Sequence, residues 1–308
     1  MTKRILSCAM TALLLCLSAS CAFDSSDSDG RLRVVSTIFA PYDFARAVAG
    51  DLAEITMLLP PAGESHSFEP TPQDIVRMRN CGVFVYVGGE SDAWVERILS
   101  AMDTDRIQVV TLMDCVETVE EDVVEGMEGG GEAEPDEHVW TSPKNAGLIT
   151  RKIAGAMCAA DPENAAAYQA NTEAYLAELD ALDREFREVV DRAVRKTIAF
   201  GDRFPFRYFV DAYGLDYCAA FPGCSTETEA SVNTVIFLIG KIRAEGIPVV
   251  FHAELSNENM ARAIGSATGA KVLRLHACHS ISRADFEAGR TYLDLMHENL
   301  EALKEALM

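Results

Sequence analysis

Positive charge is scarce in this sequence. Its 308 residues contain 27 lysines and arginines against 48 aspartates and glutamates, which gives a formal net charge of −21. Binding to nucleic acid requires clustered basic side chains that neutralise phosphates, so this balance argues against a nucleic-acid partner. An acidic protein can handle cations, although acidity by itself also serves solubility.

Long apolar runs are also scarce. An apolar stretch extends from Ile5 to Leu17, behind the basic residues Lys3 and Arg4. It is too short for a permanent transmembrane helix, which needs about 20 apolar residues. A basic start, a short apolar run and small residues after it are typical of an export signal that is removed.

The end of this leader resembles a bacterial lipobox that closes at Cys21. We therefore predict a signal peptide over residues 1–20, a lipid anchor on Cys21 and a flexible tether over residues 21–30. The alternative is ordinary cleavage near Ser20 or Ala22, which would release an unanchored secreted protein.

Contiguous metal-binding motifs such as HExxH do not occur, and the chain has only 6 histidines. A metal site would therefore have to be assembled from distant segments. His66 lies in a stiff loop rich in proline and glycine, and His138 lies in a turn-rich loop that enters a helix. His276 and His279 follow a predicted strand. Any one of them alone would more simply be a solvated loop residue, so only their convergence would make a site.

Cysteine, in contrast, is plentiful, with 9 residues, and export would permit disulfides. Connectivity cannot be read from a sequence. We nevertheless predict one bridge between Cys224 and Cys278, which would fix the loop that carries His276. The alternative is that these cysteines are buried free thiols.

Short apolar segments alternate with amphipathic segments along most of the chain. In the first part, strands are predicted at 33–37, 53–59, 83–88 and 107–112, and helices at 42–49, 72–79, 92–102 and 143–158. From residue 197 onward the alternation resumes. The pattern predicts an α/β fold with two lobes, 31–158 and 197–308, each with a mainly parallel sheet flanked by helices.

Residues 159–196, between the lobes, are predicted to form one long backbone helix. Asp161 can cap it, Pro162 suits its first turn, and apolar residues recur at three- and four-residue steps from Tyr168 to Val190. A helix of about 35 residues would measure roughly 50 Å, which is too long for one lobe, so we expect it to run along both. A coiled-coil dimer helix is the alternative, but the apolar pattern is short, so we expect a monomer.

Residues 116–137 interrupt the α/β pattern. They contain ten acidic residues, three consecutive glycines and no aromatic residue. Such a composition buries too little apolar surface to become ordered, so we predict a disordered, solvated loop. A weak cation-collecting role is the alternative.

Several stretches together resemble the solute-binding proteins of zinc and manganese ABC importers, the ZnuA/TroA-type family. The resemblance begins in residues 34–48, includes the His66 loop and the sequence Glu-His-Val-Trp at 137–140, and continues through 161–171 and 292–300. It covers nearly the whole mature chain. It implies two lobes joined by a backbone helix and a metal bound between the lobes.

The resemblance also implies a set of metal ligands. His66 and His138 match the first two ligands of the family, and His276 takes the place of the fourth, where relatives commonly have aspartate. The third ligand, a histidine or glutamate, has no clear match. Asp202 or His279 could fill that position.

Two further residues bear on this assignment. Arg203 falls near the place of the missing ligand, and its guanidinium would repel a cation. Glu254 follows another predicted strand and is a candidate to contact the metal directly or to orient one of its ligands.

Imidazole nitrogens favour zinc, whereas oxygen-rich sites favour manganese, magnesium or calcium. We therefore expect high-affinity binding of a divalent transition metal, zinc rather than manganese, in the periplasm or at the cell surface. The metal would pass to the permease of an ABC importer, and the protein would be anchored to the membrane by its lipid. No catalysis is expected. The rival hypotheses are a manganese or iron importer component, a surface adhesin with an incidental metal site, and a secreted zinc hydrolase.

Overall fold

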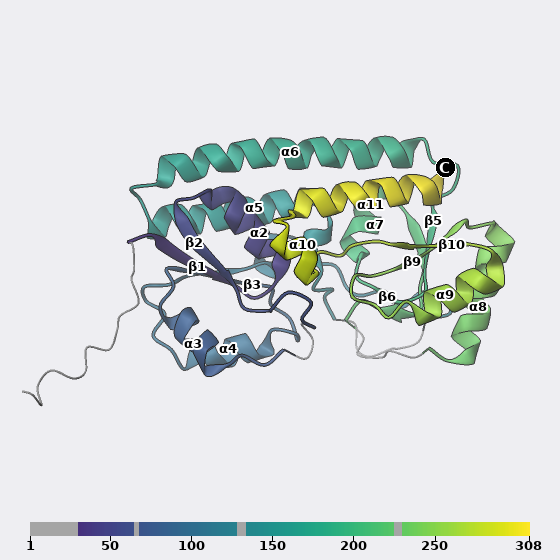
Figure 1. Cartoon of the computed structure of the whole chain (residues 1–308), viewed down its shortest axis with the longest axis horizontal. Coiled ribbons are helices and arrows are strands. Elements are labelled where there is room, and N and C mark those ends of the chain that lie inside the picture. The colour runs from purple at the N-terminus through teal and green to yellow at the C-terminus, as the bar shows by residue number, and fades with distance from the viewer. Residues whose placement is uncertain (1–29, 65–67, 128–133, 225–229) are drawn as a thin grey trace, which may run out of the picture. The chain divides into compact units, whose positions relative to one another are not determined.

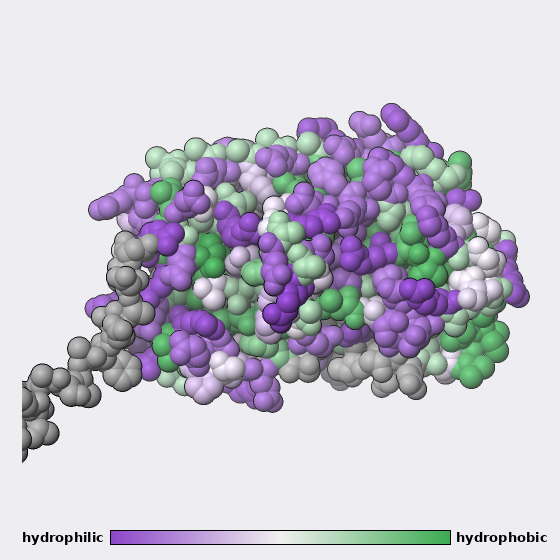
Figure 2. Space-filling model, in the orientation of Figure 1, coloured by the Kyte–Doolittle hydropathy of each residue, from purple (hydrophilic) through white to green (hydrophobic). Residues whose placement is uncertain are grey.

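The computed structural model describes residues 30–64, 68–127, 134–224 and 230–308 (Figure 1). The predictions for Cys21 and His66 therefore lie outside the described residues. Residues Leu32–Met308 form one compact unit, and hydrophilic residues cover most of the face of it seen in Figure 2. Within the described ranges, no helix combines the length and the apolar character that crossing a bilayer requires.

The first lobe contains a parallel sheet of four strands in the order β2-β1-β3-β4. Its strands are β1 (Leu32–Ser36), β2 (Ala53–Met57), β3 (Val83–Tyr86) and β4 (Gln108–Thr111), and its helices are α2 (Phe39–Ala49), α3 (Pro72–Arg79), α4 (Ala93–Ser100) and α5 (Pro143–Ala160). Along β3, Val83 and Val85 join the core that includes α2 and α5, whereas Phe84 and Tyr86 join the core of α3 and α4. Both faces of the sheet are buried, which explains its continuous apolar strands.

The second lobe repeats this architecture with a parallel sheet in the order β10-β9-β5-β7. Its strands are β5 (Thr197–Phe200), β7 (Asp216–Cys218), β9 (Val249–His252) and β10 (Lys271–Arg274), and its helices are α7 (Arg207–Tyr213), α8 (Val232–Glu245), α9 (Asn259–Thr268), α10 (Arg283–Glu287) and α11 (Tyr292–Leu307). A separate pair, β6 (Arg203–Phe204) and β8 (Phe221–Pro222), follows β5 and β7. The predicted α/β fold with two parallel sheets is confirmed.

Helix α6 (Ala165–Asp191) runs along both lobes, as predicted (Figure 1). It packs against α2 and α5 of the first lobe and against α7 and α11 of the second. With 27 residues it measures about 40 Å, and it begins later than predicted. The carboxylate of Asp161 accepts hydrogen bonds from the Asn164 amide and the Tyr168 hydroxyl, both at 2.7 Å, and these bonds hold a separate turn before the helix.

The described parts of the acidic segment, 116–127 and 134–137, form hydrogen bonds with residues of the second lobe. The Tyr208 hydroxyl donates to the Asp136 carbonyl at 2.8 Å and accepts from the Val119 amide at 3.2 Å. The Tyr217 hydroxyl donates to the Asp122 carbonyl at 3.3 Å. Both tyrosines belong to the second lobe, so this segment has tertiary partners that its own composition does not reveal.

Candidate metal centre

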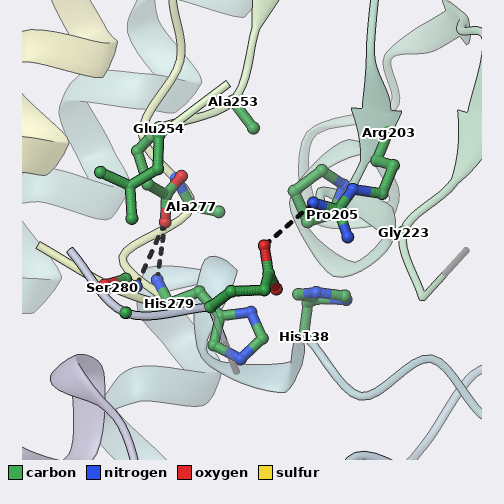
Figure 3. Close-up of a pocket in the computed structure, with 12 residues that line it drawn as sticks. His138, Arg203, Pro205, Gly223, Ala253, Glu254, Ala277, His279 and Ser280 are labelled. Atoms are coloured by element: carbon green, nitrogen blue, oxygen red, sulfur yellow. Dashed lines mark hydrogen bonds and ion pairs between the residues drawn. The ribbon is translucent and has the colours of Figure 1, made fainter. Parts of the chain in front are cut away.

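A cavity of about 50 Å³ lies where segments of both lobes meet (Figure 3). Its polar lining consists mainly of Glu64, His138, Arg203, Glu254, His279 and Ser280. Most of these residues follow the carboxyl ends of strands, which is where open α/β sheets bind ligands. The volume suits a single small ion with its immediate ligands.

The imidazole of His138 is held from behind by a carboxylate. Asp136 Oδ1 accepts a bond from the His138 backbone amide at 2.7 Å and lies 3.2 Å from its Nδ1. Because a carboxylate only accepts, Nδ1 of the neutral ring carries the hydrogen and Nε2 keeps its lone pair, the arrangement typical of a metal-binding histidine. Burial lowers the pKa of His138, but the carboxylates of Asp136, Glu137 and Glu121 outweigh it, so the pKa is raised overall.

His279 faces His138 across this cavity. The two ring centres are 5.4 Å apart with an interplanar angle of 82°. Two imidazoles whose nitrogens bind one zinc ion at about 2.0–2.1 Å have ring centres about 5 to 5.5 Å apart. The observed spacing therefore fits a pair of ligands on one cation.

Trp140 supports both rings. Its indole lies 5.5 Å from the ring centre of His138 and 5.1 Å from that of His279. Its Nε1–H donates to the Ala277 carbonyl at 2.7 Å, which ties the first lobe to the loop that carries His279. At the same cavity the buried Ser280 hydroxyl has no hydrogen-bond partner among the described residues, as expected where a water or a ligand binds.

The structure places His276 away from the cavity lining. It is buried, and its Nδ1 accepts a hydrogen bond from the Cys278 amide at 3.0 Å. Its backbone exchanges two bonds with the Asn299 side chain, at 2.6 and 2.8 Å. Burial lowers the pKa of His276. In this conformation the ring stabilises the loop after β10.

The carboxylates of Asp202 and Glu254 both accept bonds from backbone amides. Asp202 accepts from Arg203 at 2.9 Å and from Ala253 at 3.2 Å, and it does not line the cavity. Glu254 lines the cavity but accepts from the amides of Ala277 at 2.7 Å, His279 at 2.9 Å and Ser280 at 3.4 Å. Both side chains therefore shape the loops of the second lobe.

The described residues thus bring together two of the predicted ligands, His138 and His279. Across the described ranges, no group of three or more His, Cys, Asp or Glu side chains is placed to hold a metal ion. That statement does not cover His66, because residues 65–67 lie outside the described ranges. Its role as a ligand stays a prediction.

The predicted disulfide between Cys224 and Cys278 is wrong. All six cysteines in the described part of the chain are free. Cys278 is fully buried beside the His276 carbonyl, whereas the Cys224 amide donates to Glu121 at 2.8 Å. Burial raises the pKa of the Cys278 thiol well above its usual value, which disfavours the thiolate form that binds metals.

Two features of the site were not predicted from the sequence. One is the support of His138 by Asp136, for which the only signal was an acid two residues before a loop histidine. The other is an ion pair between Arg203 and Glu64, with 3.3 Å between Nη2 and Oε2, which joins the two lobes at the cavity. No sequence signal paired these two residues, which are 139 positions apart.

Comparison with protein families gives one match over most of the chain. Residues 34–306 match the family ZnuA, described as the periplasmic component A of a zinc-uptake complex. The chain is 29% identical over 295 residues to the high-affinity zinc uptake system protein ZnuA of Bacillus subtilis, covering 92% of this chain and 90% of that protein. It is 28% identical over 308 residues to the zinc-binding lipoprotein AdcA of Streptococcus pneumoniae, covering 96% of this chain but only 61% of that relative's length.

Solved structures give a consistent picture of the fold. The metal-dependent lipoprotein YcdH of Bacillus subtilis has a TM-score of 0.78 with 28% identity, covering 90% of this chain and 100% of that one. The Zn(II)-bound ZnuA-like domain of Streptococcus pneumoniae AdcA has a TM-score of 0.75 with 27% identity, covering 90% of this chain and 99% of that domain.

Proposed function

Because this chain belongs to the ZnuA family, the periplasmic component A of zinc-uptake complexes, we propose that it binds a divalent metal ion outside the cytoplasmic membrane for delivery to an ABC importer. The family consists of solute-binding transport proteins and not of enzymes. The chain spans about three fifths of the streptococcal relatives that it matches, so the cargo and the partner permease belong to this proposal.

The cargo that we propose is zinc. The observation that carries this choice is the pair of imidazoles, His138 and His279, facing each other at 5.4 Å with Asp136 behind the first. Nitrogen ligands favour zinc, whereas a manganese site would be built mainly from oxygen atoms. A relative named for zinc binding in Streptococcus pneumoniae and one named for zinc uptake in Bacillus subtilis agree with this choice.

Our proposed ligand set is His66, His138 and His279. His276 and Asp202 are the two remaining candidates from the sequence. To bind the cargo, either would have to give up the backbone hydrogen bonds that it accepts in the described conformation. We therefore propose that these two side chains hold the loops beside the ligands.

The test is zinc affinity, measured by competition with a chromogenic chelator. His138→Ala and His279→Ala should each weaken zinc binding by about tenfold or more, because each removes a nitrogen ligand. His297→Ala is the matched control, since that imidazole is 51% exposed on α11 and does not line the cavity. Unchanged affinity in the first two variants, with native circular dichroism, would refute the zinc-binding function. Stronger retention of manganese than of zinc by the wild-type protein would refute the choice of cargo.

We also propose that a lipid on Cys21 holds the protein at the membrane, as the name of the relative AdcA of Streptococcus pneumoniae, a zinc-binding lipoprotein, suggests. Cys21→Ser should move the protein from the membrane fraction to the soluble secreted fraction, because the acylated thiol would be lost. Fractionation of cells expressing each form measures this. A wild-type protein that is already soluble would contradict the anchor.

A further inference from the structure

The cavity that we assign to a cation contains a permanent positive charge. Arg203 lines it together with His138 and His279. A guanidinium keeps its proton at any physiological pH and repels a divalent cation. A carboxylate in contact with Arg203 would offset this repulsion.

Arg203 has a fixed direction because it lies on a strand. Strand β6 pairs with β8, with Arg203 opposite Phe221. The next residue, Phe204, is 2% exposed and stacks on Tyr217 with ring centres 3.8 Å apart. Successive side chains of a strand point to opposite sides, so burial of Phe204 directs Arg203 toward the cavity.

The negative charge beside Arg203 comes from Glu64. The two side chains form an ion pair at 3.3 Å, with Arg203 27% exposed and Glu64 51% exposed. Glu64 is brought to the cavity by a tight turn in which the Ala62 amide donates to the Ile281 carbonyl of the second lobe at 2.7 Å. Gly63 is required in this turn, because a Cβ there would lie 2.8 Å from the Pro60 carbonyl oxygen.

The other acidic residue of the cavity lining is not available for the metal. Glu254 is 6% exposed and its two oxygens accept bonds from three backbone amides of the loop 277–280. A carboxylate occupied in this way would have to release the loop that carries His279 in order to turn to a cation. Glu64 is 51% exposed at the cavity, and its binding to a cation there would not release the loop that carries His279. The two oxygens of a carboxylate can bridge a guanidinium and a cation.

We propose that Glu64 is a ligand of the bound metal and that Arg203 is the residue that positions it. One oxygen of Glu64 binds the cation beside the imidazoles of His138 and His279, and the other stays paired with Arg203. Glu64 thereby offsets the charge of Arg203 and supplies an acidic ligand without releasing the loop that carries His279. This inference rests on the proposed metal-binding function and extends its ligand set.

The test begins with Glu64→Gln, which removes the charge and keeps the size. In a buffer free of carboxylates and chloride, this variant should bind zinc about tenfold or more weakly than the wild type. Glu69→Gln is the matched control, since Glu69 is an exposed glutamate of the same loop that does not line the cavity. X-ray absorption at the zinc edge should show one oxygen ligand fewer in Glu64→Gln. Wild-type affinity and an unchanged spectrum in this variant would overturn the proposal.

The role of Arg203 is tested by replacing it both in the wild-type protein and in the Glu64→Gln variant. The direction in which zinc affinity changes is then compared between the two. In the wild-type background, Arg203→Met should weaken zinc binding several-fold, because Glu64 loses the partner that positions it. In the Glu64→Gln background the same substitution should strengthen binding, because only the repulsion between guanidinium and zinc is then removed. Strengthening by the same factor in both backgrounds would overturn the positioning role.

Two further results separate this inference from its premise. If His138→Ala loses zinc but Glu64→Gln does not, the ligand assignment falls while the proposed function stands. If neither variant loses zinc, both fall. A wild-type affinity that rises with added acetate would show that an external anion occupies the position of Glu64, and would overturn the assignment.

Discussion

At the scale of single residues, the group that contacts Nδ1 of each imidazole distinguishes the metal-binding candidates from the other histidines. His138 and His276 are both buried loop histidines. His138 has a carboxylate at Nδ1, which fixes a hydrogen there and leaves Nε2 for a metal. His276 has a backbone amide at Nδ1 and therefore acts as an acceptor within its own loop. The sequence presents the two residues alike, because the partner of each ring depends on how its loop folds.

Asp92 gives a pH dependence of stability that can be measured. It is 5% exposed, and its carboxylate accepts bonds from the amides of Val87 at 2.7 Å and Gly88 at 3.3 Å. Burial, which outweighs these hydrogen bonds, raises its pKa from 3.8 to about 7. Between these two values the folded protein binds more protons at Asp92 than the unfolded chain does. The contribution of this residue to the free energy of unfolding therefore rises as pH falls from about 7 to 4, by at most about 1.4 kcal/mol per pH unit.

The comparison that isolates this effect is wild type against Asp92→Asn, which cannot titrate. Urea unfolding at several pH values across that window measures the free energy of unfolding of both proteins. As pH falls, the wild type should become more stable relative to Asp92→Asn. Asp51→Asn, the same substitution at an exposed position, serves as the control for the exchange of carboxylate for amide. A constant difference for Asp92→Asn would show that its pKa is not raised.

At the scale of elements, α6 joins the two lobes through a single buried stripe. Leu182, near the middle of this helix, is fully buried in the core that contains residues of both lobes. Leu182→Ala should lower the free energy of unfolding by about 2–5 kcal/mol, because it removes buried methyl groups and leaves a cavity. Leu148→Ala, on the neighbouring helix α5 at 42% exposure, should change it by about 0.5 kcal/mol or less. Chemical denaturation measures both, and equal effects would contradict the central position of Leu182.

At the scale of the whole compact unit, the lobes are joined by hydrogen bonds close to the proposed site. The Phe39 amide donates to the His279 carbonyl at 3.2 Å, and the Ala62 amide donates to the Ile281 carbonyl at 2.7 Å. The Tyr292 hydroxyl donates to the Trp140 carbonyl at 2.9 Å. The loop with His279 belongs to the second lobe in sequence but is bonded to the first. A metal bound there would therefore add one more connection to an interface that is already formed.

The sequence by itself determined the elements of this protein and the loops in which its histidines lie. Apolar period and turn residues are local properties, so the two parallel sheets and the long helix follow from them. The loop positions of His138, before a predicted helix, and of His279, after a predicted strand, follow from them too. Only the tertiary structure decided which loops meet and how each side chain is used. In the folded protein, His276 accepts a hydrogen bond within its own loop, and Asp202 and Glu254 accept hydrogen bonds from backbone amides. The described parts of the acidic segment are hydrogen-bonded to Tyr208 and Tyr217. Glu64 is paired with Arg203. These outcomes depend on contacts between residues far apart in the chain. A local sequence pattern does not predict which distant group a polar side chain will contact.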